Sequence, residues 1–251
     1  LSRSPLQPAY QPGRPPPPSP APRRRPEWVA YDGGLAEFGH AGTGFAFDNE
    51  TPRHRAYATP FALASHPVTQ GEFAAFIDDD GYRRPELWLA AGWDCVQQRG
   101  WTAPLYWQRV DGRWRTFTLH GIVDVDPQTP LAHVSYFEAD AFARWARARL
   151  PTEFEWELAA RDVPVAGNFV ESGALNPLAL HAAPPAGRPA QLFGDVWEWT
   201  ASAYAPYPRY RPAPGALGEY NGKFMCNQYV LRGGSCASPA SHLRATYRNY
   251  F

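Results

Sequence analysis

The spacing of apolar residues predicts three short amphipathic helices along the chain. Each predicted helix begins with a hydroxyl residue followed three positions later by a glutamate, the capping-box pattern of a helix amino terminus. The three pairs are Thr69 with Glu72, Ser135 with Glu138 and Thr152 with Glu155. After the second pair, apolar side chains recur at helical spacing at Phe137, Ala141, Phe142 and Trp145. One face of that helix is therefore expected to be buried.

The remaining apolar runs are short and lie between glycine- and proline-rich turns, a pattern typical of short strands. Residues 114–119 and 229–231 are the clearest examples. Aromatic residues make up 15% of the chain, and we expect packed tryptophan and tyrosine side chains to hold long irregular segments in place. The predicted fold class is α+β, with much irregular backbone.

A change in composition divides the chain near residue 27. Residues 1–26 contain ten prolines and five arginines but few large apolar groups, so this segment cannot bury enough surface to offset its ordering entropy. We interpret residues 1–27 as an extended linker that follows another folded body, with an ordinary disordered tail as the alternative. Residues 28–251 are expected to form one domain.

Charge and cysteine content narrow the class of partner. Lysine plus arginine and aspartate plus glutamate number 24 each, so no net field draws the chain to nucleic acid or to an anionic membrane. No run approaches the roughly 18 apolar residues that span a bilayer. The three scattered cysteines, Cys95, Cys226 and Cys236, favour a reducing compartment. We expect a soluble, cytoplasmic protein that binds a small molecule or a protein.

Four uncommon strings occur in one order and together carry a family resemblance. They are His-Pro-Val-Thr at 66–69, Arg-Leu-Pro-Thr-Glu-Phe-Glu-Trp-Glu at 149–157, Gly-Asp-Val-Trp-Glu-Trp at 194–199 and Leu-Arg-Gly-Gly-Ser at 231–235. The region 28–251 thereby resembles the formylglycine-generating-enzyme fold, a C-type-lectin-like superfamily. The resemblance implies a domain whose last strand lies beyond residue 251.

Other strings are similar to one branch of that superfamily, the sulfoxide synthases of ergothioneine biosynthesis. These strings lie at residues 44–50, 103–107, 218–225 and 246–251. The resemblance implies an oxygen-dependent enzyme that uses iron(II) to join a cysteine-containing thiol to Nα-trimethylhistidine. In that family an amino-terminal helical-bundle domain binds the iron, partly through a His-x3-His-x-Glu string that this chain lacks. We therefore expect this chain to bind no iron and to be inactive without that domain.

The same resemblance places the substrate-binding residues near the carboxy terminus. Tyr220, Tyr250 and Phe251 are candidates for the trimethylammonium group, which proteins hold with aromatic faces. Asn249 offers both a donor and an acceptor to a polar substrate group. We expect these four residues to share one pocket. The family's catalytic tyrosine stays open among Tyr220 and two neighbours, Tyr207 and Tyr210.

Other motif residues are expected to have structural roles. Trp197 and Trp199 are interpreted as packed indoles flanking a hydrogen-bonded Glu198. In the run Arg232, Gly233, Gly234 and Ser235, the glycines allow close backbone approach or positive φ, and the arginine suits a buried carboxylate. The acidic residues at 153, 155 and 157 are attributed to the start of a helix, with no catalytic role.

Two alternative functions compete with that of a sulfoxide synthase. One is a stand-alone lectin-like module that binds a ligand or a protein without catalysis, because fold alone does not determine function. The other is copper-dependent thiol oxidation, as in formylglycine-generating enzymes. By resemblance that chemistry needs a cysteine pair at the positions of Ser238 and Leu243, and Cys236 lies outside this register. We interpret Cys236 as a packed residue.

Overall fold

Three helices begin at the predicted capping boxes in the structure, which is a computed structural model describing residues 9–10, 26–180 and 187–251. They are α1 (Gln70–Asp78), α3 (Tyr136–Trp145) and α4 (Glu153–Ala160). In each, the hydroxyl of the N-cap residue accepts from the backbone N–H of the glutamate, whose carboxylate accepts from the N-cap N–H. All three helix predictions are confirmed.

Two further helices were not predicted. They are α2 (Ala90–Arg99) and α5 (Ala216–Gly222). The N-cap positions of both, Leu89 and Gly215, make no side-chain cap hydrogen bond, so neither helix carries the local start signal. Five short 3₁₀ helices lie in the connections among the described residues, at Asp48–Glu50, Gly81–Arg83, Pro85–Leu87, Val170–Ser172 and Ala240–His242.

The strands pair into small antiparallel sheets. β1 (Trp28–Tyr31) pairs with β4 (Phe61–Ala64), and β2 (Gly34–Phe38) pairs with β3 (His54–Ala58). β5 (Trp107–Val110), β6 (Arg113–Thr118) and β7 (Gly121–Asp124) form a meander. β8 (Glu198–Ala203), β9 (Tyr229–Arg232) and β10 (Asn249–Tyr250) form a sheet in the order β10-β9-β8. The predicted strands at 114–119 and 229–231 correspond to β6 and β9.

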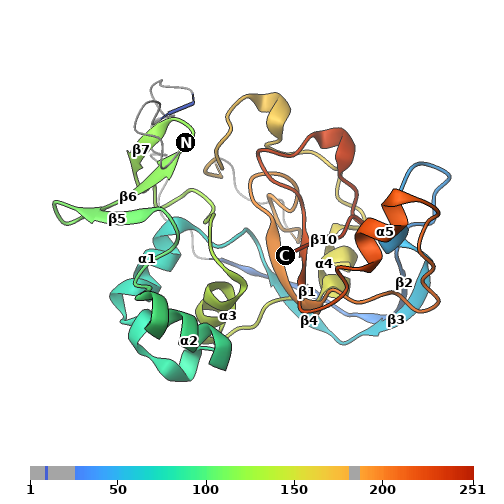
Figure 1. The fold of residues 1–251 in the computed structure, drawn as a ribbon, viewed down its shortest axis with the longest axis horizontal. Helices are drawn as coiled ribbons and strands as arrows, with labels where there is room; N and C mark the ends of the chain where they lie inside the picture. Colours follow the sequence, from blue (N-terminus) through green and yellow to red (C-terminus); the bar gives the residue numbers. More distant parts are fainter. Residues whose placement is uncertain (1–8, 11–25, 181–186) are drawn as a thin grey trace.

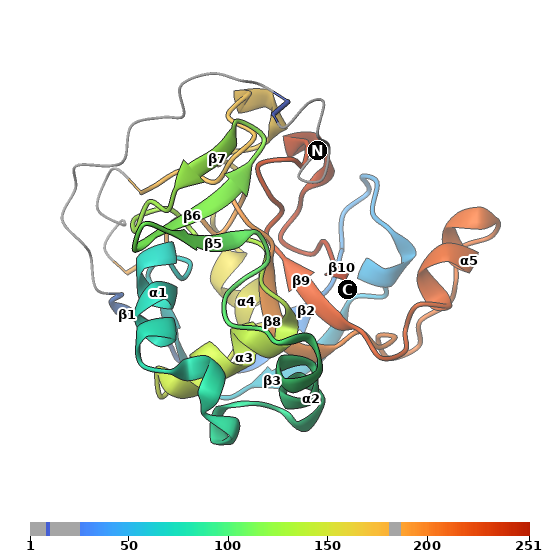
Figure 2. The same cartoon turned by 60° about the vertical axis from the view of Figure 1, so that its left-hand side comes forward.

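The elements divide between two sides of the molecule. Figure 1 shows α1, α2, α3 and the β5–β7 meander on one side, with α4, α5 and the β8–β10 sheet on the other. Turned by 60°, the view in Figure 2 places the meander next to α1 and leaves α5 at the outer edge. The α+β class with small sheets and much irregular backbone is thus confirmed.

Each side has its own hydrophobic core. The first is built around the rings of Phe73 and Phe76 from α1, which are fully buried. The second surrounds Trp156 from α4, which is also fully buried and meets Phe193 edge to face at 5.5 Å between ring centroids. These cores hold the carboxy-terminal sheet and the helices in fixed relation, because close-packed aromatic side chains tolerate little displacement.

The first strand begins at Trp28, next to the predicted start of the folded domain at residue 28. Most of the predicted linker, residues 1–27, lies outside the described residues. Within it, Tyr10 donates its backbone N–H to the carbonyl of Leu119 at 2.9 Å, while 61% of the residue stays exposed. In the part of the chain that is described, no helix combines the length and apolar character needed to cross a bilayer.

Candidate functional site

The predicted site residues at the carboxy terminus lie on the edge strand β10. Asn249 pairs with Leu231 and Tyr250 pairs with Val230 of β9. Phe251 continues the ladder, because its N–H donates to the carbonyl of Tyr229 at 3.2 Å and its carbonyl accepts from the Tyr229 N–H at 3.0 Å. Backbone pairing with β9 therefore fixes the register of all three residues in the sheet.

Tyr250 takes part in a group of aromatic side chains that includes Tyr220. We call Tyr220, Phe224 and Tyr250 the aromatic face. Phe224 lies between the two tyrosines, with ring centroids 5.1 Å from Tyr220 and 5.8 Å from Tyr250. The Tyr220 and Tyr250 centroids are 6.5 Å apart, and Tyr204 stacks on Tyr250 at 4.0 Å. Tyr220 is 58% exposed, so this face is open to a ligand.

A polar network attaches the helix that carries Tyr220 to the rest of the domain. Asn221 donates from Nδ2 to Asp48 Oδ1 at 2.6 Å, and its Oδ1 accepts from the Tyr250 hydroxyl at 3.4 Å. The other oxygen of Asp48 accepts from the Tyr210 hydroxyl at 2.9 Å and from the backbone N–H of Ala213 at 3.0 Å. One carboxylate thus connects α5, the preceding loop and the segment of residues 48–50.

The structure brings Tyr220 and Tyr250 together but does not bring Phe251 into contact with them. Successive side chains of a strand point to opposite faces, so Phe251 lies on the side of β10 away from Tyr250. Its ring contacts Trp199, with centroids 6.5 Å apart, and 85% of the residue is exposed. Asn249 shares that side by the same alternation. The four predicted residues therefore lie on two sides of β10, with Tyr250 and the α5 residue Tyr220 on one side and Asn249 and Phe251 on the other.

A buried group of charged side chains lies directly behind the carboxy-terminal strand. Arg248 donates from Nε to Glu153 Oε2 at 2.8 Å and from Nη2 to Glu153 Oε1 at 3.0 Å. Arg232 donates from Nη2 to Glu153 Oε2 at 2.8 Å and to Glu157 Oε2 at 3.1 Å. Both arginine side chains are at most 1% exposed. The prediction that Arg232 meets a buried carboxylate is confirmed.

The attribution of the α4 glutamates to the helix start is confirmed for Glu153 and Glu155, which lie in the first turn, and is wrong for Glu157. Glu155 completes the capping box and also pairs with Arg149 at 2.6 Å. Glu153 and Glu157 also accept from buried guanidinium groups. They compensate charge in the interior, where an unpaired arginine is strongly disfavoured.

The three candidate tyrosines, Tyr207, Tyr210 and Tyr220, differ in burial and in their hydrogen-bond partners. Tyr207 is buried, and its hydroxyl lies 3.3 Å from Nη2 of Arg232. Burial raises the pKa of Tyr207 above its usual value. Burial and the hydrogen bond to Asp48 likewise raise the pKa of Tyr210. Tyr207 and Tyr210 both have structural partners, whereas Tyr220 is the exposed one of the three.

The tryptophan motif packs largely as predicted. Glu198 Oε2 accepts from Trp156 Nε1 at 3.0 Å. Trp197 packs on Tyr247 with centroids 5.7 Å apart, and Trp199 donates from Nε1 to the carbonyl of Val134 at 3.1 Å. The interpretation of packed indoles around a bonded glutamate is therefore confirmed, although only one oxygen of Glu198 has a hydrogen-bond partner among the described residues.

The glycine motif meets both of the predicted backbone requirements. Gly233 and Gly234 have φ of +94° and +86°, and a Cβ on Gly233 would lie 2.5 Å from the carbonyl oxygen of Leu192. The N–H of Ser235 donates to the hydroxyl of Ser238 at 3.2 Å. Burial raises the pKa of Cys236 to about 11, with a further contribution from Asp195, so this thiol stays protonated at neutral pH.

Sequence reasoning missed several residues that build the site. Arg248, Phe224 and Asp48 were not singled out, although all three lie inside strings that carry the family resemblance. Their roles depend on contacts with residues far away in sequence, such as the pair of Arg248 with Glu153, which are 95 residues apart. Such pairings have no signature in local spacing.

The described residues do not fit an iron site. Among them, no group of three or more histidine, cysteine, aspartate or glutamate side chains is placed to hold a metal ion. A non-haem iron centre needs about three such ligands. This part of the chain therefore offers no such set of ligands.

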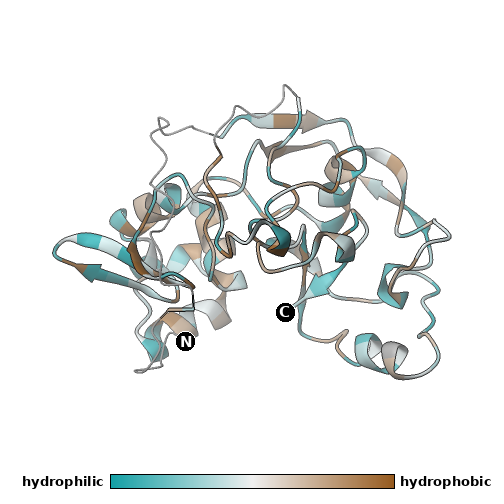
Figure 3. Cartoon of the chain, turned by 90° about the horizontal axis from the view of Figure 1, so that it is seen from above, coloured by the Kyte–Doolittle hydropathy of each residue, from teal (hydrophilic) through white to brown (hydrophobic). Residues whose placement is uncertain are grey.

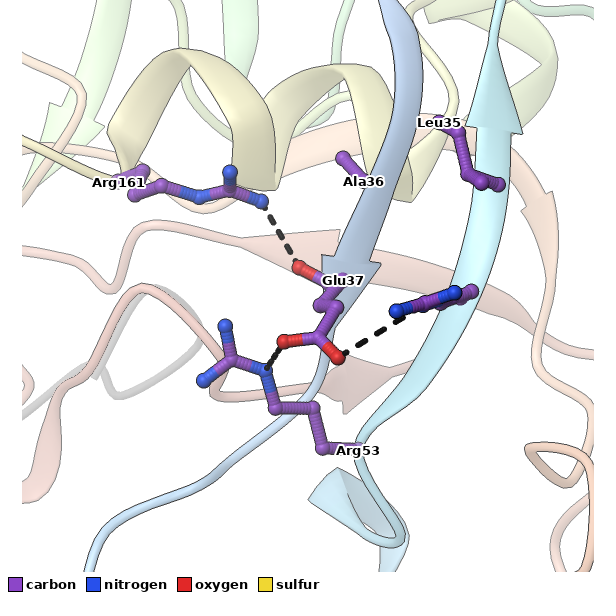
Figure 4. A pocket seen from close by; sticks show the side chains of 6 residues that line it. Leu35, Ala36, Glu37, Arg53 and Arg161 are labelled. Atoms are coloured by element: carbon purple, nitrogen blue, oxygen red, sulfur yellow. Dashed lines mark hydrogen bonds and ion pairs between the residues drawn. The ribbon is translucent and has the colours of Figure 1, made fainter.

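A shallow surface pocket of about 440 Å³ lies beside β2 and β3. Figure 4 shows Glu37 between Arg53 and Arg161. Glu37 Oε2 lies 3.1 Å from Arg53 Nε, and the backbone carbonyl of Glu37 accepts from Arg161 Nη2 at 2.8 Å. Since these exposed charged groups already form ion pairs or hydrogen bonds within the protein, they have little capacity left to bind a charged ligand.

Comparisons with known proteins give a consistent picture. The family model described as "Sulfatase-modifying factor enzyme 1-like domain" matches residues 15–188 and 175–251. A hercynine oxygenase of Mycolicibacterium thermoresistibile is 42% identical over 233 residues, covering 82% of this chain and 50% of that protein. A hercynine oxygenase of Mycobacterium tuberculosis is 40% identical over 226 residues, covering 82% of this chain and 52% of that protein. This chain thus spans about half the length of these curated relatives.

More distant relatives share the fold. A formylglycine-generating enzyme of Streptomyces coelicolor is 30% identical over 279 residues, covering 90% of this chain and 82% of that protein. The structure of PvdO from Pseudomonas aeruginosa superposes with a TM-score of 0.59 at 21% identity, covering 90% of this chain and 88% of that one. At that identity the likeness concerns the fold alone.

Proposed function

This chain belongs to the family of sulfatase-modifying factor enzyme 1-like domains, and from that premise we propose that it is the substrate-binding part of a hercynine oxygenase. The complete enzyme would be an iron(II)- and oxygen-dependent sulfoxide synthase of ergothioneine biosynthesis. It would join a cysteine-containing thiol to Nα-trimethylhistidine. The observation that carries the proposal is the identity of 40% to 42% with hercynine oxygenases over 82% of the chain.

The half-length match supports a division of labour within the proposed enzyme. Because the described residues offer no group of metal ligands, the iron that supplies the oxygen chemistry would be held by a partner domain, the helical bundle of the sulfoxide synthases. This chain would bind the substrates, orient them and exclude water from the reacting atoms.

The aromatic face is the proposed contact for the trimethylammonium group. A quaternary ammonium cannot donate a conventional hydrogen bond, and aromatic rings attract it through their negative faces. Tyr250 is held by its stack on Tyr204, and Tyr220 is exposed beside it. On the other face of β10, Asn249 and Phe251 are proposed to contact another part of the substrates. Phe251 cannot accept a hydrogen bond from the thiol substrate as an acidic residue would.

The test is a calorimetric titration of the 251-residue chain with Nα-trimethylhistidine and with unmethylated histidine. We expect the trimethylated compound to bind more tightly. Replacing Tyr220 by alanine should weaken its binding by about 0.5–2 kcal/mol, or roughly 2- to 30-fold, the usual range for one aromatic ring.

The matched control is Tyr220→Phe, which keeps the ring and removes only the hydroxyl group. It should bind trimethylhistidine nearly as tightly as the unaltered chain. Equal affinities for the two histidine compounds, or unchanged affinity in a folded Tyr220→Ala variant, would remove the aromatic face from the proposed site.

A further inference from the structure

A cavity of about 620 Å³ lies between the two sides of the domain. Helices α1 and α3 and the strand β4 form part of its wall, and the segment of residues 192–199 forms another part. The volume is within the usual range for small-molecule sites. Most of the lining is apolar, and its aromatic members include Phe61, Phe73, Phe142, Trp145 and Trp197. An occupant of this cavity therefore needs an apolar body.

Most charged side chains in the lining are already compensated within the protein. Arg149 and Glu155 form an ion pair at 2.6 Å. The carboxylate of Glu72 accepts from the backbone N–H and the hydroxyl of Thr69 at 2.8 Å and 2.9 Å, at the amino end of α1. Burial raises the pKa of the Glu198 carboxyl to about 8, so this group is mostly uncharged at neutral pH. None of these groups leaves a free charge for an occupant of the cavity.

Arg147 is the exception among the charged groups of the lining. It is exposed and yet lines the cavity, so it lies where the cavity opens to solvent. No described residue forms a hydrogen bond or an ion pair with its guanidinium group. Within the described part of the chain, the cavity thus combines an apolar interior with an available positive charge at its mouth.

The backbone holds Arg147 in a conformation that favours glycine. Helix α3 ends with two backbone hydrogen bonds of the Schellman type, from the N–H of Arg147 to the carbonyl of Arg144 at 3.0 Å and from the N–H of Ala148 to the carbonyl of Ala143 at 2.8 Å. Arg147 takes the positive φ of this turn, at +57°. Glycine is the usual residue there, because a β-carbon disfavours left-handed backbone. A side chain kept at a disfavoured position is a candidate for a functional role.

We propose that this cavity binds a small organic acid with an apolar body, an aryl or alkyl carboxylate, whose carboxylate pairs with the guanidinium group of Arg147. A planar guanidinium can donate two parallel hydrogen bonds to one carboxylate. The apolar body would lie among the indole and phenyl rings of the lining and be removed from water. A neutral compound of the same shape would gain only the apolar contacts.

The proposed carboxylate site is separate from the aromatic face that we assign to trimethylhistidine. The cavity is lined by α1, α3, β4 and the segment of residues 192–199, whereas Tyr220 and Tyr250 lie on α5 and β10. The ligands that test the cavity are not substrates of the proposed enzyme. Either proposal can therefore fail without the other.

The experiment titrates the 251-residue chain with 4-phenylbutyrate and, as a neutral compound of matched shape, with 4-phenylbutanol. Tryptophan fluorescence reports binding, because indoles line the cavity, and calorimetry gives the stoichiometry. At neutral pH we expect one phenylbutyrate per chain. The acid should bind about three- to tenfold more tightly than the alcohol, because only the acid pairs with the guanidinium group.

The variant Arg147→Gly separates binding from folding. It removes the guanidinium group and suits the positive φ, so it should keep or raise the thermal midpoint. Its affinity for phenylbutyrate should fall to that for the alcohol, whose own binding should not change. The matched control is Arg113→Gln, which removes another exposed arginine outside the cavity lining and should leave both affinities unchanged.

A second pair of variants tests whether the ligand lies inside the cavity. Ala139 on α3 belongs to the lining, and Ala139→Leu would fill part of the space. Both compounds should then bind about tenfold more weakly. Ala91→Leu, at an exposed position of α2 outside the lining, is the control and should leave both affinities unchanged.

Several results would overturn the proposal. Absence of saturable phenylbutyrate binding would mean that the cavity holds only water. Equal affinities for the acid and the alcohol would mean that apolar contacts alone hold the ligand. Unaltered acid binding in a folded Arg147→Gly variant would place the carboxylate at another group, and unaltered binding in a folded Ala139→Leu variant would place the ligand outside the cavity.

Discussion

Replacing Glu198 by glutamine should change how the stability of the domain depends on pH. The folded chain keeps the proton on this carboxyl up to a pKa of about 8, whereas the reference value is 4.5. Between these values the unfolded chain has released the proton and the folded chain has not. The folded state binds more protons there, so the free energy of unfolding falls as pH rises. Above pH 8 this contribution is constant.

The size of the effect follows from the shift. Each pH unit inside the window lowers the free energy of unfolding by about 1.4 kcal/mol, so the two units from pH 5.5 to 7.5 correspond to at most about 2.7 kcal/mol. Partial hydration of the Glu198 side chain would reduce its desolvation, and we therefore expect about 1–2.7 kcal/mol. Glutamine does not titrate, so Glu198→Gln should gain this amount relative to the unaltered chain over that interval.

The assay is urea unfolding of both proteins at pH 5.5, 6.5 and 7.5, with the difference in free energy taken at each pH. Taking the difference removes the contributions of all other titrating groups, provided that both proteins unfold in one step. A difference that stays constant to within about 0.5 kcal/mol from pH 5.5 to 7.5 would refute the reasoning. It would mean that Glu198 is already ionised and hydrated in the folded chain.

Two further substitutions test the buried charges and the glycine motif. Glu153→Gln leaves two buried guanidinium groups short of one negative charge and should destabilise the domain by about 3–5 kcal/mol in urea unfolding, whereas the exposed Glu37→Gln should change it by less than about 1 kcal/mol. Gly233→Ala should lower the thermal midpoint more than Gly173→Ala, because both glycines have positive φ but only the first meets a backbone oxygen within 3 Å. Equal effects within either pair would contradict these assignments.

Local signals were sufficient to predict α1, α3 and α4. A capping box involves residues three positions apart, so the sequence contains both partners. Helix α2 has Leu89 as its N-cap residue and no side-chain cap, and its one local signal is Gly100, which ends it in the left-handed conformation. Helix α5 follows Gly215 and also lacks a side-chain cap. Both helices form because of tertiary contacts, which spacing rules do not record.

The candidate site was predictable only in part, for a related reason. The resemblance placed Tyr220 and Tyr250 in one site, and the structure brings their rings close together. The resemblance also suggested that Phe251 shares one pocket with these tyrosines. Strand alternation argues against that grouping once β10 is recognised, since neighbouring residues of a strand face opposite sides. A two-residue edge strand has too little pattern to be recognised from the sequence alone.

The two tyrosines of the aromatic face are held in different ways, which bears on how the proposed substrate would be positioned. Tyr250 follows Arg248, whose guanidinium is fixed by Glu153 and by the carbonyl of Asn49 at 2.9 Å. It therefore lies on a rigid part of the domain, as a precise binding contact requires.

Tyr220, by contrast, lies on the peripheral helix α5, which Figure 3 shows at the margin of the domain. Asp48 connects this helix to the domain through Asn221 and through the loop before it. Loss of that carboxylate would leave Tyr250 in place and free Tyr220 to move. If the aromatic face binds the trimethylammonium group, Asp48→Asn should therefore weaken binding about as much as Tyr220→Ala, because a ring contributes only while it stays within about 6 Å of the cation. Undiminished binding in Asp48→Asn, with a loss in Tyr220→Ala, would mean that α5 is held by its remaining contacts.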